Sequence, residues 1–198
     1  MLDFSFPVYI ALCGWPKTGK SEVQKILEAR YGAISVDDGE PMRDFAIRHL
    51  GATFEDVHTQ DGKARLVTLH GGKTMTWRKF LGEFGNRIEE LLGADAIPEI
   101  AIAKSQTPGQ VYSFGSVRRE QGYVYRRHGG IVIEVQNKFV PPSEHEFDRF
   151  NPKAVQYVIP NHVPLEQRGP ESLAALHRAT IELLDALLPV RPAASRAA

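Results

Sequence analysis

The segment from Gly14 to Ser21 combines residue types and a spacing that could do chemistry. It reads Gly-Trp-Pro-Lys-Thr-Gly-Lys-Ser and fits the pattern G-x-x-x-x-G-K-[ST] at every fixed position. The glycines of this pattern let the backbone curl, so that several N–H groups point at phosphate oxygens. The lysine, here Lys20, reaches the β- and γ-phosphates, and the hydroxyl, here of Ser21, holds Mg²⁺. The segment therefore predicts a nucleoside triphosphate site with Mg²⁺.

The residues around this segment provide the context that phosphate binding requires. Val8–Leu12 is apolar at consecutive positions, which is typical of a central parallel strand covered on both faces. After Ser21, apolar residues recur at helical spacing up to Gly32, which is placed where a helix ends. Because motif and context agree, we prefer this interpretation to a chance glycine turn before a helix. The predicted ATP-binding residues of the loop are Gly14, Lys17, Thr18, Gly19, Lys20 and Ser21, and for Lys17 a solvated position is an equal alternative.

Strand patterns alternate with helix patterns along the rest of the chain. The predicted strands are Val8–Leu12, Ala33–Val36, Gln110–Phe114, Gly130–Val135 and Gln156–Ile159. The predicted helices after the first are Pro41–Leu50, Thr76–Leu92, Ala96–Ser105, Val117–His128 and Pro170–Leu188. This alternation predicts an α/β fold in three layers, with a central, mainly parallel five-stranded sheet and helices on both faces. Ligands of such sheets bind at the carboxyl ends of the strands.

The composition indicates a single soluble domain spanning residues 1–198. Of the 198 residues 42% are hydrophobic, and 24 Lys and Arg balance 24 Asp and Glu. This balance disfavours wholesale disorder, and the zero net charge argues against a nucleic-acid polymer as a partner. The single cysteine cannot form an intramolecular disulfide, and no apolar run approaches the ~20 residues of a membrane span. We expect a cytoplasmic monomer or homodimer without a membrane partner.

A phosphate loop leaves three reaction classes open: a GTPase switch, an ATP-driven machine and a small-molecule kinase. A switch would carry the motif N-K-x-D, but residues 137–140 read Asn-Lys-Phe-Val and lack the aspartate. An ATP-driven machine would usually show an apolar strand that ends in a pair of Mg²⁺-binding acidic residues. Ile131–Val135 does not end in such a pair. A compact kinase fits the sequence best.

Arginines and aspartates that follow predicted strands are candidates to hold the group that receives the phosphate. Arg43, Arg78 and Arg118 fall on segments that could line the cleft, and arginine binds phosphate with a planar fork. Asp37 and Asp38 end the second predicted strand, where one of them could orient a Mg²⁺-bound water or an acceptor hydroxyl. Each arginine alone could also be a surface salt-bridge residue, and Asp-Asp-Gly is good turn chemistry. We take all five as candidate substrate-binding residues.

Several stretches, in order along the chain, resemble the deoxynucleoside monophosphate kinases of tailed bacteriophages. Besides the phosphate loop, Thr76–Asn86 is similar to the family segment T-x-R-x-L-L-Q-x-x-G-T. Val117–Val135 is similar to its helix D-x-R-x-x-x-E, which is followed by two glycines and a strand. Val158–Asn161 is similar to the I-x-N ending that the family shares with dephospho-coenzyme A kinases. The resemblance covers most of the chain.

The resemblance implies transfer of the γ-phosphate of ATP to a deoxynucleoside 5′-monophosphate (dNMP), which gives ADP and the diphosphate, with Mg²⁺ as cofactor. By matched position, Arg78 and Arg118 would bind the acceptor or the transferring phosphate and, with Lys20, would be the catalytic residues. Asn161 would lie near the adenine of ATP. If the chain is phage-encoded, its compartment is the host cytoplasm. The acceptor side would include the polar insertion at residues 52–75, which we predict to be a long irregular loop.

Two alternatives stay open because the sequence departs from the family pattern. Gly82 stands for the usual glutamine, Asn86 for the usual threonine, and no aspartate precedes Arg118. The alternatives are a kinase for another small acceptor, such as dephospho-coenzyme A, and a nucleotide-binding module without transfer chemistry. In the kinase interpretation, residues 52–75 and the lid-like loop at residues 137–152 close over the site and exclude water. Residues 189–198 are predicted to be a flexible tail.

Overall fold

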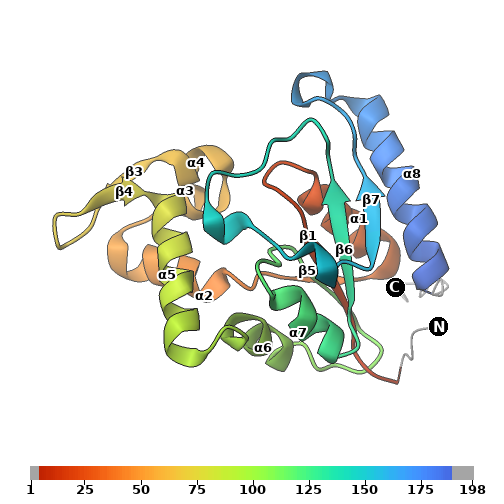
Figure 1. Cartoon of the computed structure of the whole chain (residues 1–198), viewed down its shortest axis with the longest axis horizontal. Coiled ribbons are helices and arrows are strands. Elements are labelled where there is room, and N and C mark those ends of the chain that lie inside the picture. The colour runs from red at the N-terminus through yellow and green to blue at the C-terminus, as the bar shows by residue number, and fades with distance from the viewer. Residues whose placement is uncertain (1–4, 189–198) are drawn as a thin grey trace, which may run out of the picture.

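A five-stranded parallel sheet forms the centre of the computed structural model, which describes residues 5–188 (Figure 1). Its strands are β1 (Val8–Cys13), β2 (Ile34–Val36), β5 (Val111–Phe114), β6 (Ile131–Gln136) and β7 (Tyr157–Pro160). They are arranged in the order β2-β5-β1-β6-β7, and every neighbouring pair is parallel. The predicted α/β fold with a parallel five-stranded sheet is confirmed.

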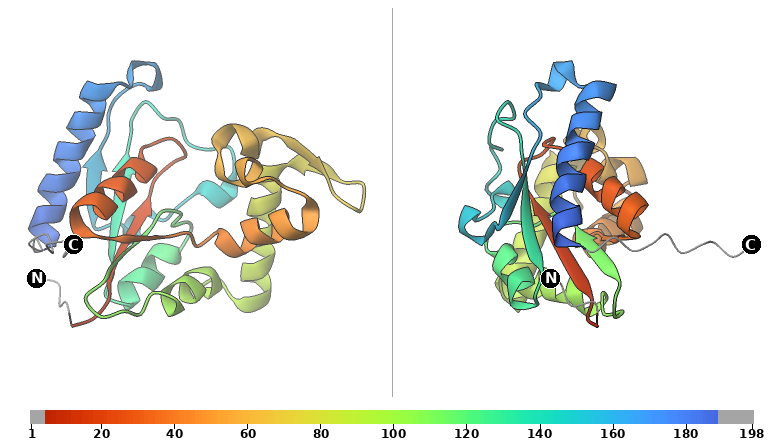
Figure 2. Two further views of the ribbon diagram at one scale, coloured as in Figure 1. Left: turned by 180° about the vertical axis from the view of Figure 1, so that it is seen from behind. Right: turned by 90° about the vertical axis from the view of Figure 1, so that its right-hand side faces the viewer.

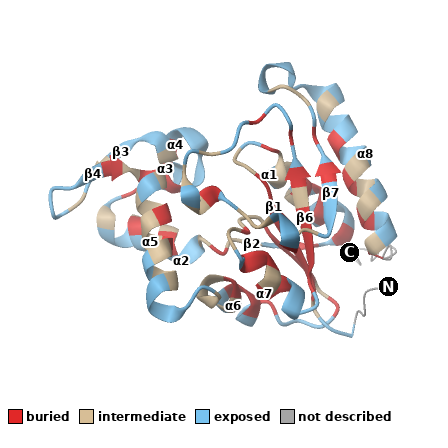
Figure 3. Cartoon of the chain, viewed as in Figure 1, coloured by how far each residue is buried: buried red, intermediate tan, exposed pale blue. Residues whose placement is uncertain are grey.

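Helices cover both faces of this sheet, which explains why β1 is apolar at every position. Val8, Ile10 and Leu12 point into one core, which they share with residues of α1 (Lys20–Tyr31) and α8 (Pro170–Leu187). Alternate residues, from Tyr9 to Cys13, point into a second core with residues of α6 (Ala96–Ala103) and α7 (Gln121–Arg127). Figure 2 shows α1 and α8 side by side on their face, and Figure 3 shows buried residues concentrated in the central strands.

A second group of elements lies to one side of the sheet and consists of residues 40–92. It comprises α2 (Glu40–Leu50), α3 (Phe54–His58), α4 (Gln60–Ala64), the hairpin of β3 (Leu66–Thr68) with β4 (Thr74–Thr76), and α5 (Trp77–Leu92). Its core contains Ala46, Ala52, Val57 and Trp77. The prediction that residues 52–75 form an irregular loop is therefore wrong. Each short element buries at most two residues, so the segment shows no apolar periodicity. Threonine caps at Thr53 and Thr59 stabilise its two short helices.

The predicted helix Val117–His128 is also wrong in its first turn, because α7 begins only at Gln121. The preceding residues form an irregular segment in which Arg119 has a positive φ of 43°. The Arg119 amide donates to Arg149 O at 2.6 Å, and its carbonyl accepts from the Asn151 amide at 2.9 Å. This pairing with the segment at residues 137–152 replaces helical hydrogen bonds and leaves Arg118 outside the helix.

The remaining predicted boundaries agree with the structure to within about two residues, as is usual for helix ends. The predicted lid-like segment contains one 3-10 turn, η1 (Glu146–Asp148). None of the helices in residues 5–188 is long and apolar enough to cross a membrane. The predicted tail at residues 189–198 lies outside the described residues.

Candidate active site

The phosphate loop connects β1 to α1 at the carboxyl edge of the sheet, as predicted from the sequence. Gly14 and Gly19 have φ of 131° and 114°, a region that side-chain-bearing residues rarely adopt. A Cβ atom at Gly14 would lie 2.5 Å from Val135 O, and one at Gly19 would lie 2.7 Å from Asn161 Nδ2. Both glycines are therefore required by the turn and by the elements that pack against it.

The side chain of Lys20 lies inside the curve of the loop. Its Nζ donates to Gly14 O at 2.7 Å and to Trp15 O at 2.9 Å. Desolvation of the ammonium, together with the nearby Arg118 charge, lowers the pKa of Lys20 to about 8, while Asp148 opposes this shift. The ammonium thus lies where it can exchange loop carbonyls for phosphate oxygens.

A cleft extends from this loop to the second group of elements, and basic residues outnumber acidic residues along it. The basic residues are Lys17, Lys20, Arg43, Lys63, Arg78, Arg118 and Arg168, and the acidic residues are Glu22, Asp37 and Asp148. The structure thus brings most of the predicted donor residues together with the three predicted arginines and Asp37. Such a surplus of positive charge suits a ligand that carries several negative charges.

Two predicted ATP-binding residues, Thr18 and Asn161, do not line this cleft. Both are buried, and Asn161 Nδ2 donates to Thr18 O at 2.7 Å. The Thr18 hydroxyl donates to Trp15 O at 2.9 Å. In this structure the Asn161 amide therefore holds the shape of the phosphate loop, and its predicted place near adenine stays a prediction.

The two aspartates after β2 have different surroundings. Asp37 accepts a hydrogen bond from the Gly39 amide at 3.0 Å, which is a turn contact, and it also forms an ion pair with Arg43. Desolvation, with the Arg118 charge, lowers the pKa of Arg43 to about 10. Asp38 is buried, and burial raises its pKa, although Arg118 and a hydrogen bond with Ser116 act in the opposite direction.

Asp148 is a residue of this site that the sequence reasoning missed. Its side chain is only 6% exposed, and its carboxylate lies 3.5 Å from Arg78 Nη1 and 3.9 Å from Arg118 Nη2. Ser143 Oγ donates to the same carboxylate at 2.7 Å. An acid in a polar loop carries no signal of this position, because only the packing of residues 137–152 over the cleft brings it to the arginines.

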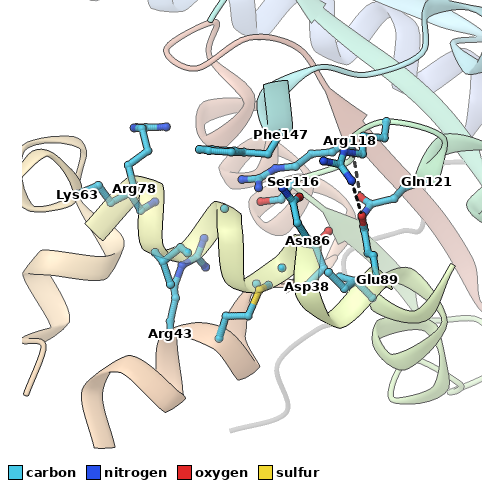
Figure 4. A pocket seen from close by; sticks show the side chains of 17 residues that line it. Asp38, Arg43, Lys63, Arg78, Asn86, Glu89, Ser116, Arg118, Gln121 and Phe147 are labelled. Carbon is cyan, nitrogen blue, oxygen red and sulfur yellow. Dashed lines mark hydrogen bonds and ion pairs between the residues drawn. The ribbon is translucent and has the colours of Figure 1, made fainter. Parts of the chain in front are cut away.

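A second pocket adjoins the cleft between α2, α5 and α7, with Arg43, Lys63, Arg78 and Arg118 common to both. Figure 4 shows Lys63 and Arg78 at one end of this pocket and Glu89 and Gln121 at the other. Glu89 accepts hydrogen bonds from Arg119 at 3.0 Å and from Gln121 at 2.8 Å. Asn86 also lines the pocket, and no residue in the described range bonds its side chain.

Gly82, which departs from the family pattern, has a structural explanation. A Cβ atom there would lie 2.3 Å from the ring of Phe147. That ring belongs to the segment at residues 137–152 and lies 5.6 Å from the Arg118 guanidinium carbon. The missing side chain in α5 therefore makes room for an aromatic residue that lines the adjoining pocket and contacts one of the predicted catalytic arginines.

Residues that could hold Mg²⁺ are present beside the loop. The Ser21 hydroxyl and the Asp37 carboxylate both line the cleft, and Mg²⁺ is bound through oxygen atoms of this kind together with substrate phosphates. The Ser21 hydroxyl and the Asp37 carboxylate do not by themselves complete the coordination of Mg²⁺. Substrate phosphate oxygens and water would supply the remaining ligands. The residues present therefore fit this cofactor.

Comparisons with known proteins find only distant similarity. No family model matches the sequence, and no curated protein matches it. A shikimate kinase from Bacteroides thetaiotaomicron is 12% identical, covering 90% of this chain and 98% of that chain, with a TM-score of 0.41. A dephospho-CoA kinase from Campylobacter jejuni is 14% identical, covering 91% of this chain and 96% of that chain, with a TM-score of 0.45. A gluconokinase from Sinorhizobium meliloti 1021 is 17% identical, covering 91% of this chain and 98% of that chain, with a TM-score of 0.32. Similarity at this level does not establish a function for this chain.

Proposed function

We propose that this chain is an ATP-dependent kinase that phosphorylates a deoxynucleoside monophosphate. The supporting observation is that the phosphate loop and three arginines open into one cleft. Arg78 and Arg118 share the buried carboxylate of Asp148, so together they can bind an anion. Two anion sites in one cleft are what transfer from one phosphate to another requires, because this chemistry depends on alignment and charge neutralisation.

On the donor side, the loop amides and Lys20 hold the phosphates of ATP. Lys20 exchanges its hydrogen bonds with the carbonyls of Gly14 and Trp15 for bonds with phosphate oxygens. Ser21 and Asp37 would hold Mg²⁺, which neutralises charge on the β- and γ-phosphates when it is bound. The positive end of the α1 dipole stabilises the same phosphates.

On the acceptor side, Arg43, Arg78 and Arg118 bind the phosphate of the acceptor and neutralise the charge that develops during transfer. Arg78 and Arg118 exchange the Asp148 carboxylate for phosphate oxygens. The nucleoside part then extends into the pocket lined by Asn86, whose amide can both donate and accept hydrogen bonds. Phe147 and the segment around it cover the reacting groups and exclude water.

A kinase for a hydroxyl-bearing acceptor, such as dephospho-coenzyme A, is a second candidate. Asp38 favours it, because one carboxylate oxygen is buried, faces the pocket region and has no hydrogen-bond partner among residues 5–188. Its raised pKa makes it a better acceptor for the proton of a hydroxyl than an ordinary carboxylate.

An acceptor panel separates these functions. ADP release from ATP and Mg²⁺ is measured with the four deoxynucleoside monophosphates, their ribonucleotide counterparts and dephospho-coenzyme A, with Lys20→Ala as the inactive control. We expect release with at least one deoxynucleoside monophosphate and none with Lys20→Ala. Release with dephospho-coenzyme A alone would select the second candidate. Tight ATP binding with no acceptor-dependent release would indicate a nucleotide-binding module.

A further inference from the structure

Lys63 is a cation of the site for which the structure shows no counter-ion. It lies in α4 and lines both the cleft and the adjoining pocket. No hydrogen bond or ion pair of its ammonium is found within residues 5–188. Figure 4 shows its side chain beside that of Arg78 at one end of the pocket. By contrast, Arg43 is paired with Asp37, and Arg78 and Arg118 are paired with Asp148.

The backbone around Lys63 is held firmly in place. The hydroxyl of Thr59 accepts a hydrogen bond from the Gly62 amide at 2.9 Å and donates to Glu55 O at 3.0 Å. A Cβ atom at Gly62 would lie 2.0 Å from that same carbonyl oxygen, so α4 can approach α3 this closely only with glycine there. These contacts fix the position from which the Lys63 side chain enters the cleft.

The surroundings of Lys63 are unfavourable to its charge. Desolvation, together with the charges of Arg43, Arg78 and Arg118, lowers the pKa of Lys63 to about 7, and only Asp148 opposes this shift. A partly buried ammonium among arginines costs free energy unless an anion compensates it. The chemistry of the site therefore calls for a ligand that brings more negative charge than the protein supplies. A phosphomonoester dianion meets this requirement, and a neutral alcohol does not.

We propose that Lys63 binds the phosphate group of the acceptor and thereby selects acceptors that already carry a phosphate. The segment at residues 52–75, which holds Lys63, then contributes a specificity-determining residue to the site. This inference rests on the proposed function for the reaction itself, whereas the anion site can be tested separately by binding.

The first experiment measures anion binding by isothermal titration calorimetry, with sulfate as the probe and with Mg-ADP added first to fill the phosphate loop. The variants are Lys63→Met and Lys63→Arg. The control is Lys73→Met, since Lys73 belongs to the same segment but is exposed and pairs with Glu83 of α5. We expect sulfate affinity to fall about tenfold or more in Lys63→Met, as loss of a charge-assisted hydrogen bond predicts. At pH 6.5, Lys63→Arg and Lys73→Met should stay near the wild type, and all should bind Mg-ADP equally. Equal sulfate affinity in Lys63→Met and wild type would overturn the inference.

The pH dependence adds a readout that a structural role of Lys63 would not change. The charged and titratable groups facing it are Arg43 of α2, His58 of α3, Arg78 of α5, Arg118 and Asp148. Sulfate stays a dianion, so its affinity should fall between pH 6.5 and 8.5 in the wild type as Lys63 loses its proton. Lys63→Arg should lack this fall, because arginine keeps its charge. An identical fall in both proteins would contradict the inference.

Kinetics then separates a failure of this inference from a failure of the proposed function. If a deoxynucleoside monophosphate is phosphorylated, Lys63→Met should raise the KM for that acceptor about tenfold and leave the KM for ATP unchanged. Turnover with an unchanged acceptor KM would refute the role of Lys63 alone. Absence of turnover with every nucleotide would refute the proposed reaction, and the sulfate titration would still decide the role of Lys63.

Discussion

Replacing Asp148 with asparagine should weaken the fold and strengthen anion binding at the same time. The carboxylate lies 3.5 Å from Arg78 Nη1 and 3.9 Å from Arg118 Nη2. Opposite charges about 4 Å apart attract by about 4 kcal/mol at an effective dielectric constant of about 20, before desolvation is subtracted. Asparagine keeps the shape and the hydrogen bond from Ser143 but removes the charge. Because desolvation cancels part of the attraction, we expect a loss of about 2 kcal/mol in the free energy of unfolding.

Thermal unfolding and sulfate titration test this prediction together. A loss of about 2 kcal/mol lowers the Tm by about 4–8 °C for a chain of this size. Arg78 and Arg118 no longer have to release a carboxylate before they bind an anion, so sulfate affinity should rise about tenfold, and added sulfate should restore much of the lost Tm. The control is Asp44→Asn, since Asp44 is 53% exposed and pairs with Arg48 on the surface of α2. An unchanged Tm together with unchanged or weaker sulfate binding would refute the reasoning.

Three further predictions follow from contacts of the same site. Gly82→Ala should lower the free energy of unfolding in urea by about 1–3 kcal/mol, because its Cβ would lie 2.3 Å from the Phe147 ring. The control Gly71→Ala, whose Cβ would meet nothing within 4 Å, should leave the stability unchanged. Equal stabilities of the two variants would contradict this packing. Asn161→Ala should raise the KM for ATP about tenfold, because it leaves the Thr18 carbonyl unpaired. The preference for ATP over GTP should not change. A changed preference would indicate that Asn161 contacts the base of the nucleotide. Between pH 7 and 9 the free energy of unfolding of the wild type should rise relative to that of Lys63→Met. The reason is that the pKa of Lys63 is lower in the folded chain, so the unfolded chain binds more protons than the folded chain in this range. Urea-unfolding free energies of the two proteins that change in parallel with pH would show that Lys63 is not desolvated.

The sequence was most informative where local pattern and tertiary structure agree. The phosphate loop could be predicted because its glycines, Lys20 and Ser21 are adjacent, and because a strand and a helix flank them. The order of strands and helices was equally accessible, since both faces of the sheet are covered and the strands read as apolar runs.

The acceptor side depended on contacts between distant segments and was only partly predictable. Arg43, Arg78 and Arg118 could be chosen by residue type. Asp148, the counter-ion that Arg78 and Arg118 share, comes from a polar loop without any periodic signal. Lys63 was hidden in the same way, because α4 is stabilised by a threonine cap and one glycine contact, which carry no apolar pattern. The hydrogen bond of Asn161 to the Thr18 carbonyl could not be predicted either, since sequence position alone does not show which partner an amide finds.

Transfer of label from γ-³²P-ATP most directly tests the claim that donor and acceptor phosphates react in one cleft. The wild-type protein is incubated with labelled ATP, Mg²⁺ and each deoxynucleoside monophosphate, and the products are separated by chromatography. The proposed function predicts label in a deoxynucleoside diphosphate, with none in the Lys20→Ala control. Label found only in ATP or inorganic phosphate, with every deoxynucleoside monophosphate, would contradict it.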